Sequence, residues 1–437
     1  MLIQFRVENH RSLRDEQALT LTTTGGNQAD RHLLRVDGLG ENLVPVAAIY
    51  GANASGKSNV LSALRFMRSA VLDSQRRWDV DGVPRDPFLL ADTDQPSLYE
   101  VDIVVDGVRY RYGFRLGDAR VIEEWLFAWP RERKASLFER DGDRFEFGKL
   151  LRGENEAIRS LTRPNSLFLF AAAQNNHATL LPIFRSFSAW RMALTHGLYL
   201  GSISSSLAKR LIPQSDALDR GAILQLLRGA DTGILDVRVD LPDNEQRSTR
   251  VRSVFFRHRA GQHPNGWLPL ALESAGTVRL LELAPHIVDT LRDGGLLCVD
   301  ELEASLHPTL ALQVVRMFND PAQNTKQAQL VFATHDANLL GSILGEPALH
   351  RDQVWFTEKD DDGATKLYPL TDFHPRKEEN LERGYLQGRY GAVPFLGDFS
   401  ALAVAKPKLD AAAARADRRG GNPTTGVYVL TELIRTR

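Results

Sequence analysis

The 437-residue sequence has little of several features that mark large classes of protein. Its single cysteine, Cys298, excludes an intramolecular disulfide and a cysteine zinc cluster, and so few cysteines fit a reducing cytosol. No stretch approaches the roughly 18 uninterrupted apolar residues of a membrane span, and the N-terminus has no apolar signal-peptide core. Lys and Arg number 54 against 55 Asp and Glu, so a global basic field is missing too. We expect a cytoplasmic protein without membrane contact, in which any nucleic-acid contact would need a local basic patch.

The order of elements indicates the fold class. Apolar runs alternate with segments of helical spacing, which predicts an α/β fold with a mostly parallel sheet. We expect strands at 2–8, 44–50, 296–300 and 329–334, and helices at 58–72, 276–291 and 308–318. Two alternating runs between 98 and 129, joined by Asp106-Gly107, predict an antiparallel hairpin and so an N-terminal antiparallel β subdomain.

The same pattern suggests domain boundaries. We expect residues 1–150 to form the first half of the α/β fold, 151–265 a mainly helical insertion or lid, 266–402 the second half, and 403–437 a linker and tail. The insertion has no three successive heptads with apolar a and d positions, so we expect a compact helical insert instead of a coiled coil.

A phosphate-binding loop is the clearest motif. Residues 51–58, GANASGKS, fit G-x-x-x-x-G-K-[ST] between an apolar strand and a helix. Backbone amides at the helix start face anionic oxygens, Lys57 bridges the β- and γ-phosphates, and the Ser58 hydroxyl ligates Mg²⁺. The nucleotide-binding candidates are Asn53, Ala54, Ser55, Gly56, Lys57, Ser58 and Asn59.

An apolar strand that ends in two carboxylates, LLCVDE at 296–301, supplies the second motif. Asp300 is the expected Mg²⁺ ligand, and Glu301 is the expected general base that polarises the attacking water. Together with the P-loop, this Walker B pattern predicts ATP and Mg²⁺ as cofactors and ATP hydrolysis as the reaction.

Three further segments follow in order: LESAGT at 272–277, LEASLHP at 302–308 and FATHD at 332–336. Alone, the first could be only a helix N-cap at Ser274, and His335 could be an ordinary loop histidine. Their order resembles signature, D-loop and switch histidine in ABC-type ATPases of the RecF and SMC branch.

With LERGYLQGRYGAVPF at 381–395, these motifs are similar to the AAA-15/AAA-21 group of ABC-type ATPases. That group includes proteins like RloA and AbiL of bacterial phage defence and is related to the OLD family. The resemblance implies that Ser274 and Gly276 contact the γ-phosphate held by another subunit, in a head-to-tail homodimer or higher even oligomer. It also implies that His335 senses the γ-phosphate in its own site and that Arg11 touches phosphates, although Arg11 could equally be a solvated turn residue.

The chain departs from the usual pattern of these ATPases at two positions, and it has two candidates for the glutamine of the Q-loop. Ala54 stands where SMC and RecF proteins usually have glycine, and Ala275 departs from the usual signature. Gln75 and Gln95 are the Q-loop candidates.

The resemblance predicts a Mg²⁺-dependent ATPase whose ATP-driven association gates a nuclease-like effector encoded nearby, in abortive infection. The alternative is a RecF-like DNA-repair or DNA-end-binding ATPase that acts directly on nucleic acid. A transporter energy subunit is disfavoured by the insert and the long C-terminal region.

Two segments bear on a second activity. The acidic run 358–362 before Gly363 could hold Mg²⁺ in a nuclease, but a hairpin turn explains it better. Basic and aromatic residues after 380 could bind single strands, but a terminal segment docked on the core is the favoured interpretation. These residues are Arg383, Tyr385, Arg389, Tyr390 and Phe395. We expect effector docking at 151–230 and 380–400.

Overall fold

The structure is a computed structural model, and it describes most of the chain up to Pro394. The described residues are 1–23, 32–36, 39–91, 94–194, 207, 210–211, 217–230, 232–240, 253–259, 266–343, 345–376 and 379–394. Residues 1–394 form one compact unit. The tail predicted at 403–437 lies outside the described residues.

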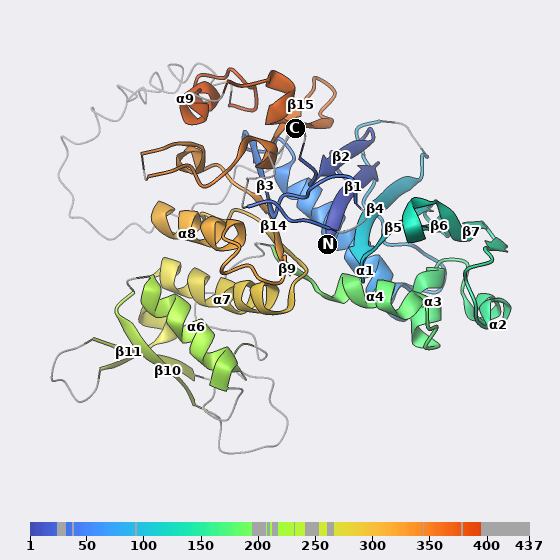
Figure 1. The fold of residues 1–437 in the computed structure, drawn as a ribbon, viewed down its shortest axis with the longest axis horizontal. Helices are drawn as coiled ribbons and strands as arrows, with labels where there is room; N and C mark the ends of the chain where they lie inside the picture. Colours follow the sequence, from blue (N-terminus) through green and yellow to red (C-terminus); the bar gives the residue numbers. More distant parts are fainter. Residues whose placement is uncertain are drawn as a thin grey trace, which may run out of the picture. The chain divides into compact units, whose positions relative to one another are not determined.

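A six-stranded sheet carries the nucleotide motifs, in the order β16-β15-β3-β14-β13-β9 (Figure 1). Its strands are β3 (Val46–Gly51), β9 (Trp190–Ala193), β13 (Leu296–Val299), β14 (Gln329–Ala333), β15 (Val354–Lys359) and β16 (Thr365–Pro369). All neighbours are parallel except β15 and β16, which form an antiparallel hairpin at the edge. The predicted α/β class is confirmed.

Helices cover both faces of this sheet, which explains why its strands read as continuous apolar runs. Ala47 and Ile49 of β3 belong to one core, with α1, and Val46, Ala48 and Tyr50 to another, with α7 and α8. The longer helices are α1 (Lys57–Arg77), α6 (Ala217–Gly229), α7 (Ala275–Asp293) and α8 (Pro308–Asn319). The shorter ones are α2 (Asn155–Leu161), α3 (Phe168–Gln174), α4 (Leu180–Ser188) and α9 (Leu381–Leu386).

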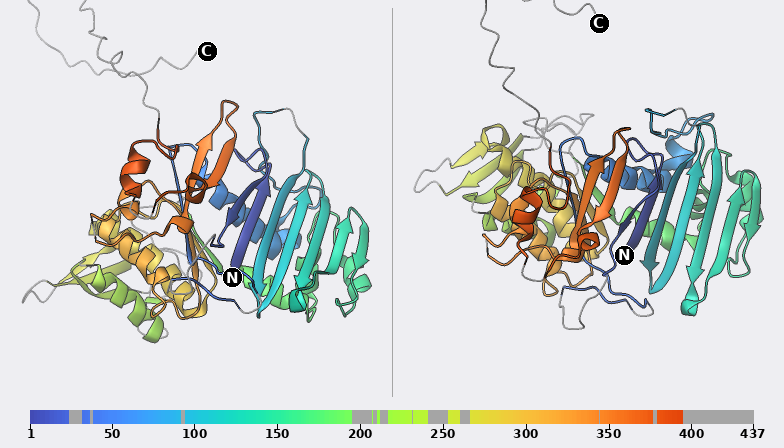
Figure 2. Two further views of the ribbon diagram at one scale, coloured as in Figure 1. Left: turned by 45° about the horizontal axis from the view of Figure 1, so that its top comes forward. Right: turned by 90° about the horizontal axis from the view of Figure 1, so that it is seen from above.

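A seven-stranded antiparallel sheet packs on the far side of α1, in the order β2-β1-β4-β5-β6-β7-β8 (Figure 2). Its strands are β1 (Leu2–Glu8), β2 (Gln17–Thr20), β4 (Ser97–Val105), β5 (Val108–Leu116), β6 (Val121–Trp129), β7 (Ala135–Asp141) and β8 (Arg144–Phe147). The predicted hairpin joins β4 and β5, and both turn residues have left-handed φ, 48° at Asp106 and 76° at Gly107. A two-residue turn of this kind matches the twist of paired strands.

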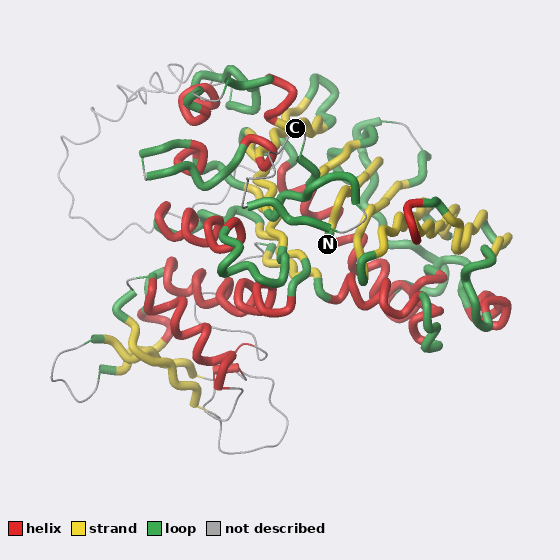
Figure 3. The backbone as a smooth tube through the Cα atoms, in the orientation of Figure 1, coloured by secondary structure: helices red, strands yellow, loops and turns green. Residues whose placement is uncertain are grey.

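The stretch predicted as one mainly helical insertion, 151–265, differs from that expectation. Helices α3 and α4 pack into the core with α1, and β9 pairs in parallel with β13. Only the later part forms a separate layer, in which α6 packs on α7 and a three-stranded sheet packs on α6 (Figure 3). That sheet contains β10 (Ile234–Asp240), β11 (Ser253–His258) and β12 (Trp267–Pro269). Four residues are too few for a sequence pattern to reveal β9.

The helices described within 151–265 span 7 to 13 residues, so none of them forms a long arm. Over the described part of the chain, no helix has the length and apolar character needed to cross a bilayer.

Candidate nucleotide site

The P-loop connects β3 to α1, and side chains of the β15–β16 hairpin form hydrogen bonds with it. Ser55 Oγ lies 2.6 Å from Thr357 Oγ1, and Thr365 Oγ1 donates to the Ser55 carbonyl at 2.8 Å. Gly56 has φ 111°, and a Cβ there would collide with Thr365, so both backbone conformation and space require glycine. These threonines come from about 300 residues downstream, and the sequence offered no local signal for them.

Ala54 also lies in the left-handed region, at φ 63°. It is exposed at the crest of the loop next to Asn53, which is exposed as well. A left-handed conformation costs an L-residue roughly 1 kcal/mol that glycine avoids. Ala54 therefore places strain in the loop that glycine would avoid.

Lys57 is buried and bends back over the loop. Its ammonium donates to the carbonyls of Gly51 at 2.9 Å and Ala52 at 3.0 Å. Burial lowers the pKa of Lys57 to about 8, and the carboxylates of Asp300 and Glu303 oppose that shift. An ammonium held by two neutral carbonyls is free to exchange them for phosphate oxygens, which are stronger acceptors.

The two predicted metal ligands lie together. Ser58 Oγ donates to Asp300 Oδ1 at 3.1 Å, between the start of α1 and the end of β13. Among the described residues no three His, Cys, Asp or Glu side chains cluster for a metal. Mg²⁺ binds oxygen ligands. In nucleotide sites these are protein hydroxyl and carboxylate groups together with phosphate and water oxygens. The residues therefore fit a Mg²⁺–nucleotide complex.

The Walker B carboxylate Glu301 follows Asp300 in a left-handed conformation, with φ 49°, and is exposed. This turn comes directly after β13. Strain at an exposed acidic residue is typical of functional positions.

His335 follows the end of β14 and lies next to Lys57. Its Nδ1 is 3.5 Å from Lys57 Nζ, and its backbone amide donates to Glu303 Oε1 at 2.5 Å. Partial burial and the charge of Lys57 lower the pKa of His335. Because an ammonium can only donate, Nδ1 is the acceptor, and the neutral ring carries its proton on Nε2.

The signature segment begins α7. Ser274 is its N-cap and accepts from the Thr277 amide at 3.1 Å, so the simple N-cap role is realised. A Cβ on Gly276 would lie 2.5 Å from the Ser305 carbonyl oxygen, which brings the signature directly against the D-loop. Ser274 is exposed, and its predicted contact with the γ-phosphate of another subunit stays a prediction.

Two other predicted phosphate contacts have different partners here. Arg11 forms an ion pair with Asp86, with Nε and a terminal nitrogen each 3.1 Å from Oδ2. Asn59 Nδ2 donates to Ser12 Oγ at 2.6 Å and so ties α1 to the turn after β1. A role of Arg11 at a phosphate would require it to leave Asp86.

Neither Q-loop candidate is placed at the phosphates by its contacts. Gln75 is in the last turns of α1, about 27 Å from Lys57 along the helix, and donates to the Leu161 carbonyl at 3.0 Å. The Gln95 carbonyl accepts from the side chain of Asn9 at 2.6 Å.

Sequence reasoning missed two residues beside the Walker B strand. Arg279, one turn into α7, is buried and donates to the Asp300 carbonyl at 3.1 Å. The sequence motif identifies Glu303 only as part of the D-loop, although a third carboxylate two residues after Glu301 is a visible signal.

The acidic run is a hairpin turn, as expected. β15 and β16 pair across it, and Asp360 Oδ1 accepts from the amides of Asp362 and Ala364 at 3.1 and 2.8 Å. Arg14 reaches both Asp360 and Asp362. These carboxylates therefore have a structural role in the turn.

The C-terminal aromatics are packed inside, as favoured from the sequence. Tyr385 is 5% exposed and Tyr390 is 1% exposed, and both stack on Phe356 of β15. Arg389 is exposed and pairs with Glu379 at 2.6 Å. Phe395 lies outside the described residues.

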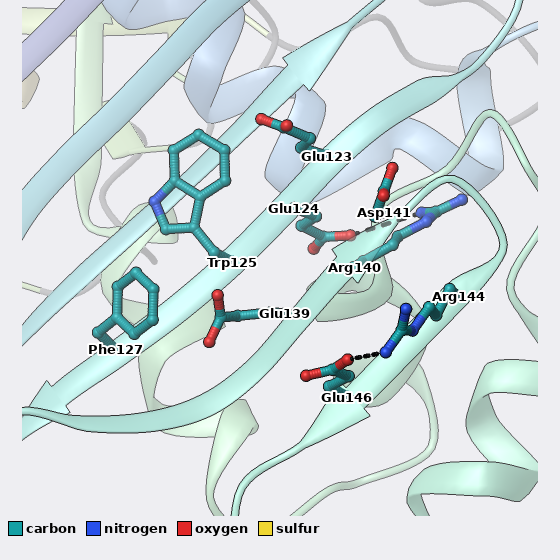
Figure 4. Close-up of a pocket in the computed structure, with 9 residues that line it drawn as sticks. All are labelled: Glu123, Glu124, Trp125, Phe127, Glu139, Arg140, Asp141, Arg144 and Glu146. Atoms are coloured by element: carbon teal, nitrogen blue, oxygen red, sulfur yellow. Dashed lines mark hydrogen bonds and ion pairs between the residues drawn. The ribbon is translucent and has the colours of Figure 1, made fainter.

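A pocket of about 360 Å³ lies away from these motifs, on the antiparallel sheet (Figure 4). Two of the residues that line it, Arg140 and the fully buried Glu124, form an ion pair at 3.6 Å. Glu124 also accepts from the amides of Phe168 and Leu169 at 2.7 and 3.1 Å, at the start of α3. Burial raises the pKa of Glu124, and these contacts oppose that shift while they fix α3 to the sheet.

Comparison with solved structures finds SMC head domains, each 12% identical to this chain. One is the SMC head domain from Thermotoga maritima, with a TM-score of 0.38 over 84% of this chain and 98% of that chain. A second is an SMC head bound to the C-winged helix domain of ScpA, with a TM-score of 0.40 and coverage of 85% and 99%. A third is an Smc head with an extended coiled coil bound to the C-terminal domain of ScpA, derived from Pyrococcus furiosus, with a TM-score of 0.38 and coverage of 89% and 98%. A search among curated proteins found no match.

A family model matches residues 46–341, from the first residue of β3 to the end of the switch-histidine loop. Its description is "AAA domain, putative AbiEii toxin, Type IV TA system". The match covers more than half of the chain and includes every nucleotide motif described above. The resemblance to the AAA-21 group is thereby confirmed, and the chain belongs to this family of AAA ATPase domains.

Proposed function

We propose that the protein hydrolyses ATP with Mg²⁺ in a site completed by a second subunit, and that this association controls a partner effector in bacterial anti-phage defence. The hydrogen bond between Ser58 and Asp300 is the observation that carries the catalytic part. It joins two sequence motifs at one point, beside Lys57 and His335.

Each residue has a distinct task in this proposal. Lys57 exchanges the Gly51 and Ala52 carbonyls for the β- and γ-phosphate oxygens. Neutral His335 donates from Nε2 to the γ-phosphate, and Glu301 accepts the proton of the attacking water. Mg²⁺, held by Ser58 and Asp300, supplies positive charge to the phosphates.

The second subunit contributes its signature segment to the nucleotide site of the first. Ser274 is exposed and Gly276 lies against the D-loop, so this surface is available to another copy. A sandwich that closes on ATP is a two-state element, and a partner that binds one state better is controlled by nucleotide. The toxin–antitoxin description of the matched family supports a place in defence.

Direct action on nucleic acid is the weaker alternative. Base stacking requires open aromatic faces, whereas Tyr385 and Tyr390 are packed in the core. A nuclease-like effector would then supply the chemistry on nucleic acid.

The direct test of the nucleotide site is Lys57→Ala. We expect loss of ATP binding in an equilibrium titration, because the substitution removes the cation of the loop. Lys149→Ala changes an exposed lysine outside the motifs and is the matched control. Unchanged affinity in Lys57→Ala would contradict the assignment.

A further inference from the structure

Glu303 fixes the backbone at the switch histidine. Its Oε1 accepts a hydrogen bond from His335 N at 2.5 Å, across 32 residues of sequence. Its other oxygen, Oε2, is buried and has no hydrogen-bond partner among the described residues. One oxygen of this carboxylate therefore accepts a hydrogen bond from the switch-histidine loop, while the other accepts none among the described residues.

The neighbouring amides of this loop are held differently. Thr334 N donates to the Ile49 carbonyl of β3 at 3.0 Å, and Asp336 N donates to the hydroxyl of Thr334 at 3.0 Å. The partners of these amides belong to the sheet or to the loop itself. His335 N is instead held by a side chain of the D-loop, which follows the Walker B carboxylates.

The contact bears on the site because of where His335 lies. Its imidazole Nδ1 is 3.5 Å from Lys57 Nζ, at the proposed γ-phosphate position. Much of the His335 side chain is open to solvent although the ring is partly buried, so packing alone holds it weakly. A shift of about 1 Å at such a position can cost on the order of 100-fold in rate.

We propose that Glu303 is a positioning residue for ATP hydrolysis, which it supports by accepting the hydrogen bond from His335 N. This inference rests on the function proposed above. What matters is the acceptor oxygen and not the negative charge. A glutamine amide oxygen can take the place of Oε1, and its NH₂ group can occupy the place of Oε2, where no donor is displaced.

The two neighbouring glutamates should therefore respond oppositely to the same substitution. Glu301→Gln removes a base, because an amide cannot take a proton from water. Glu303→Gln keeps an acceptor, whereas Glu303→Ala leaves His335 N without one.

The experiment compares four variants with the unmodified protein: Glu303→Gln, Glu303→Ala, His335→Ala and the double variant Glu303→Ala/His335→Ala. Steady-state turnover, ATP affinity and amide hydrogen exchange over 335–340 are measured for each. We expect Glu303→Ala to lower kcat by about 10- to 100-fold while ATP affinity stays within about twofold. Glu303→Gln should restore turnover to within about threefold, and the double variant should be no slower than His335→Ala.

Hydrogen exchange gives a reading that does not need hydrolysis. Residues 335–340 should exchange faster in Glu303→Ala than in the unmodified protein or in Glu303→Gln. The proposal would be overturned if Glu303→Gln turned over ATP as slowly as Glu303→Ala. It would also be overturned if the losses of kcat in the two single variants added up in the double variant.

Two further outcomes separate this inference from the proposed function. If Glu303→Ala does not fold, Glu303→Gln decides, because a loss of turnover as large as in Glu301→Gln contradicts a positioning role. If the unmodified protein binds but does not hydrolyse ATP, the proposed function fails, and unchanged exchange in Glu303→Ala would then refute the Glu303–His335 link as well.

Discussion

The Ser58 hydroxyl donates a hydrogen bond to Asp300 Oδ1 across 3.1 Å, although 242 residues separate them in the sequence. Ser58 lies in the first turn of α1, and Asp300 follows β13, which is two strands away from β3 in the sheet. Parallel strands bring their carboxyl ends to one edge, so motifs far apart in sequence converge there.

ATP affinity should depend on pH through Lys57. Its pKa in the nucleotide-free protein is lowered to about 8 by burial, and only the charged form binds phosphates well. We expect constant affinity well below pH 8 and a fall approaching tenfold per pH unit above it. Titrations between about pH 6.5 and 9.5 measure this, and Lys57→Arg, which stays charged, should show no such fall. Constant affinity of the unmodified protein up to pH 9.5 would contradict the lowered pKa.

Glu301→Gln should bind ATP and hydrolyse it very slowly. Lys57, Ser58 and Asp300 remain, whereas the proton acceptor is lost. We expect ATP-bound dimers or higher even oligomers to accumulate, as light scattering with and without ATP can show. A mass that does not change with ATP counts against ATP-driven association, unless the protein is already dimeric.

Gly276→Ala should reduce turnover while each subunit still binds ATP. The added Cβ lies 2.5 Å from the Ser305 carbonyl oxygen, so the signature and the D-loop must move apart. Gly221→Ala in α6 meets nothing within 4 Å and is the matched control. It should leave turnover unchanged and stabilise its helix by up to about 1 kcal/mol. Equal turnover in both variants would show that the signature contact is dispensable.

Ala54→Gly should stabilise the protein. Glycine relieves the left-handed φ of 63° but gains freedom in the unfolded chain, so the net effect is up to about 1 kcal/mol in the free energy of unfolding. Ala52→Gly is the control, because Ala52 is not in the left-handed region and should lose about 0.5–1 kcal/mol. Urea unfolding measures both, and a less stable Ala54→Gly would contradict the strain.

The purified protein should hydrolyse ATP but leave DNA and RNA uncut with Mg²⁺ or Mn²⁺. The carboxylate of Asp360 is occupied by turn amides and Arg14, which gives the acidic run a structural role. Cleavage that survives repurification and disappears in Asp360→Ala/Asp361→Ala would make this turn a nuclease site.

Much of the nucleotide machinery could be predicted because it is encoded locally. The strand at 2–8, the Asp106-Gly107 turn and the P-loop helix all depend on residues within a few positions of one another. The spacing of hydrophobic residues and the residue types of turns predict such local structures directly. The same patterns left the short strand β9 inside a segment expected to be helical, because β9 forms only by pairing with β13.

The sequence by itself determined the P-loop, the Walker B strand and the order of the later motifs, because each is a contiguous pattern with its own local geometry. Only the tertiary structure decided that Thr365 supports Ser55, that Glu303 holds His335, and that Tyr385 and Tyr390 are buried. These contacts depend on which strands lie side by side and which helix covers them. That arrangement is a property of the whole sheet, so no short window of sequence contains it.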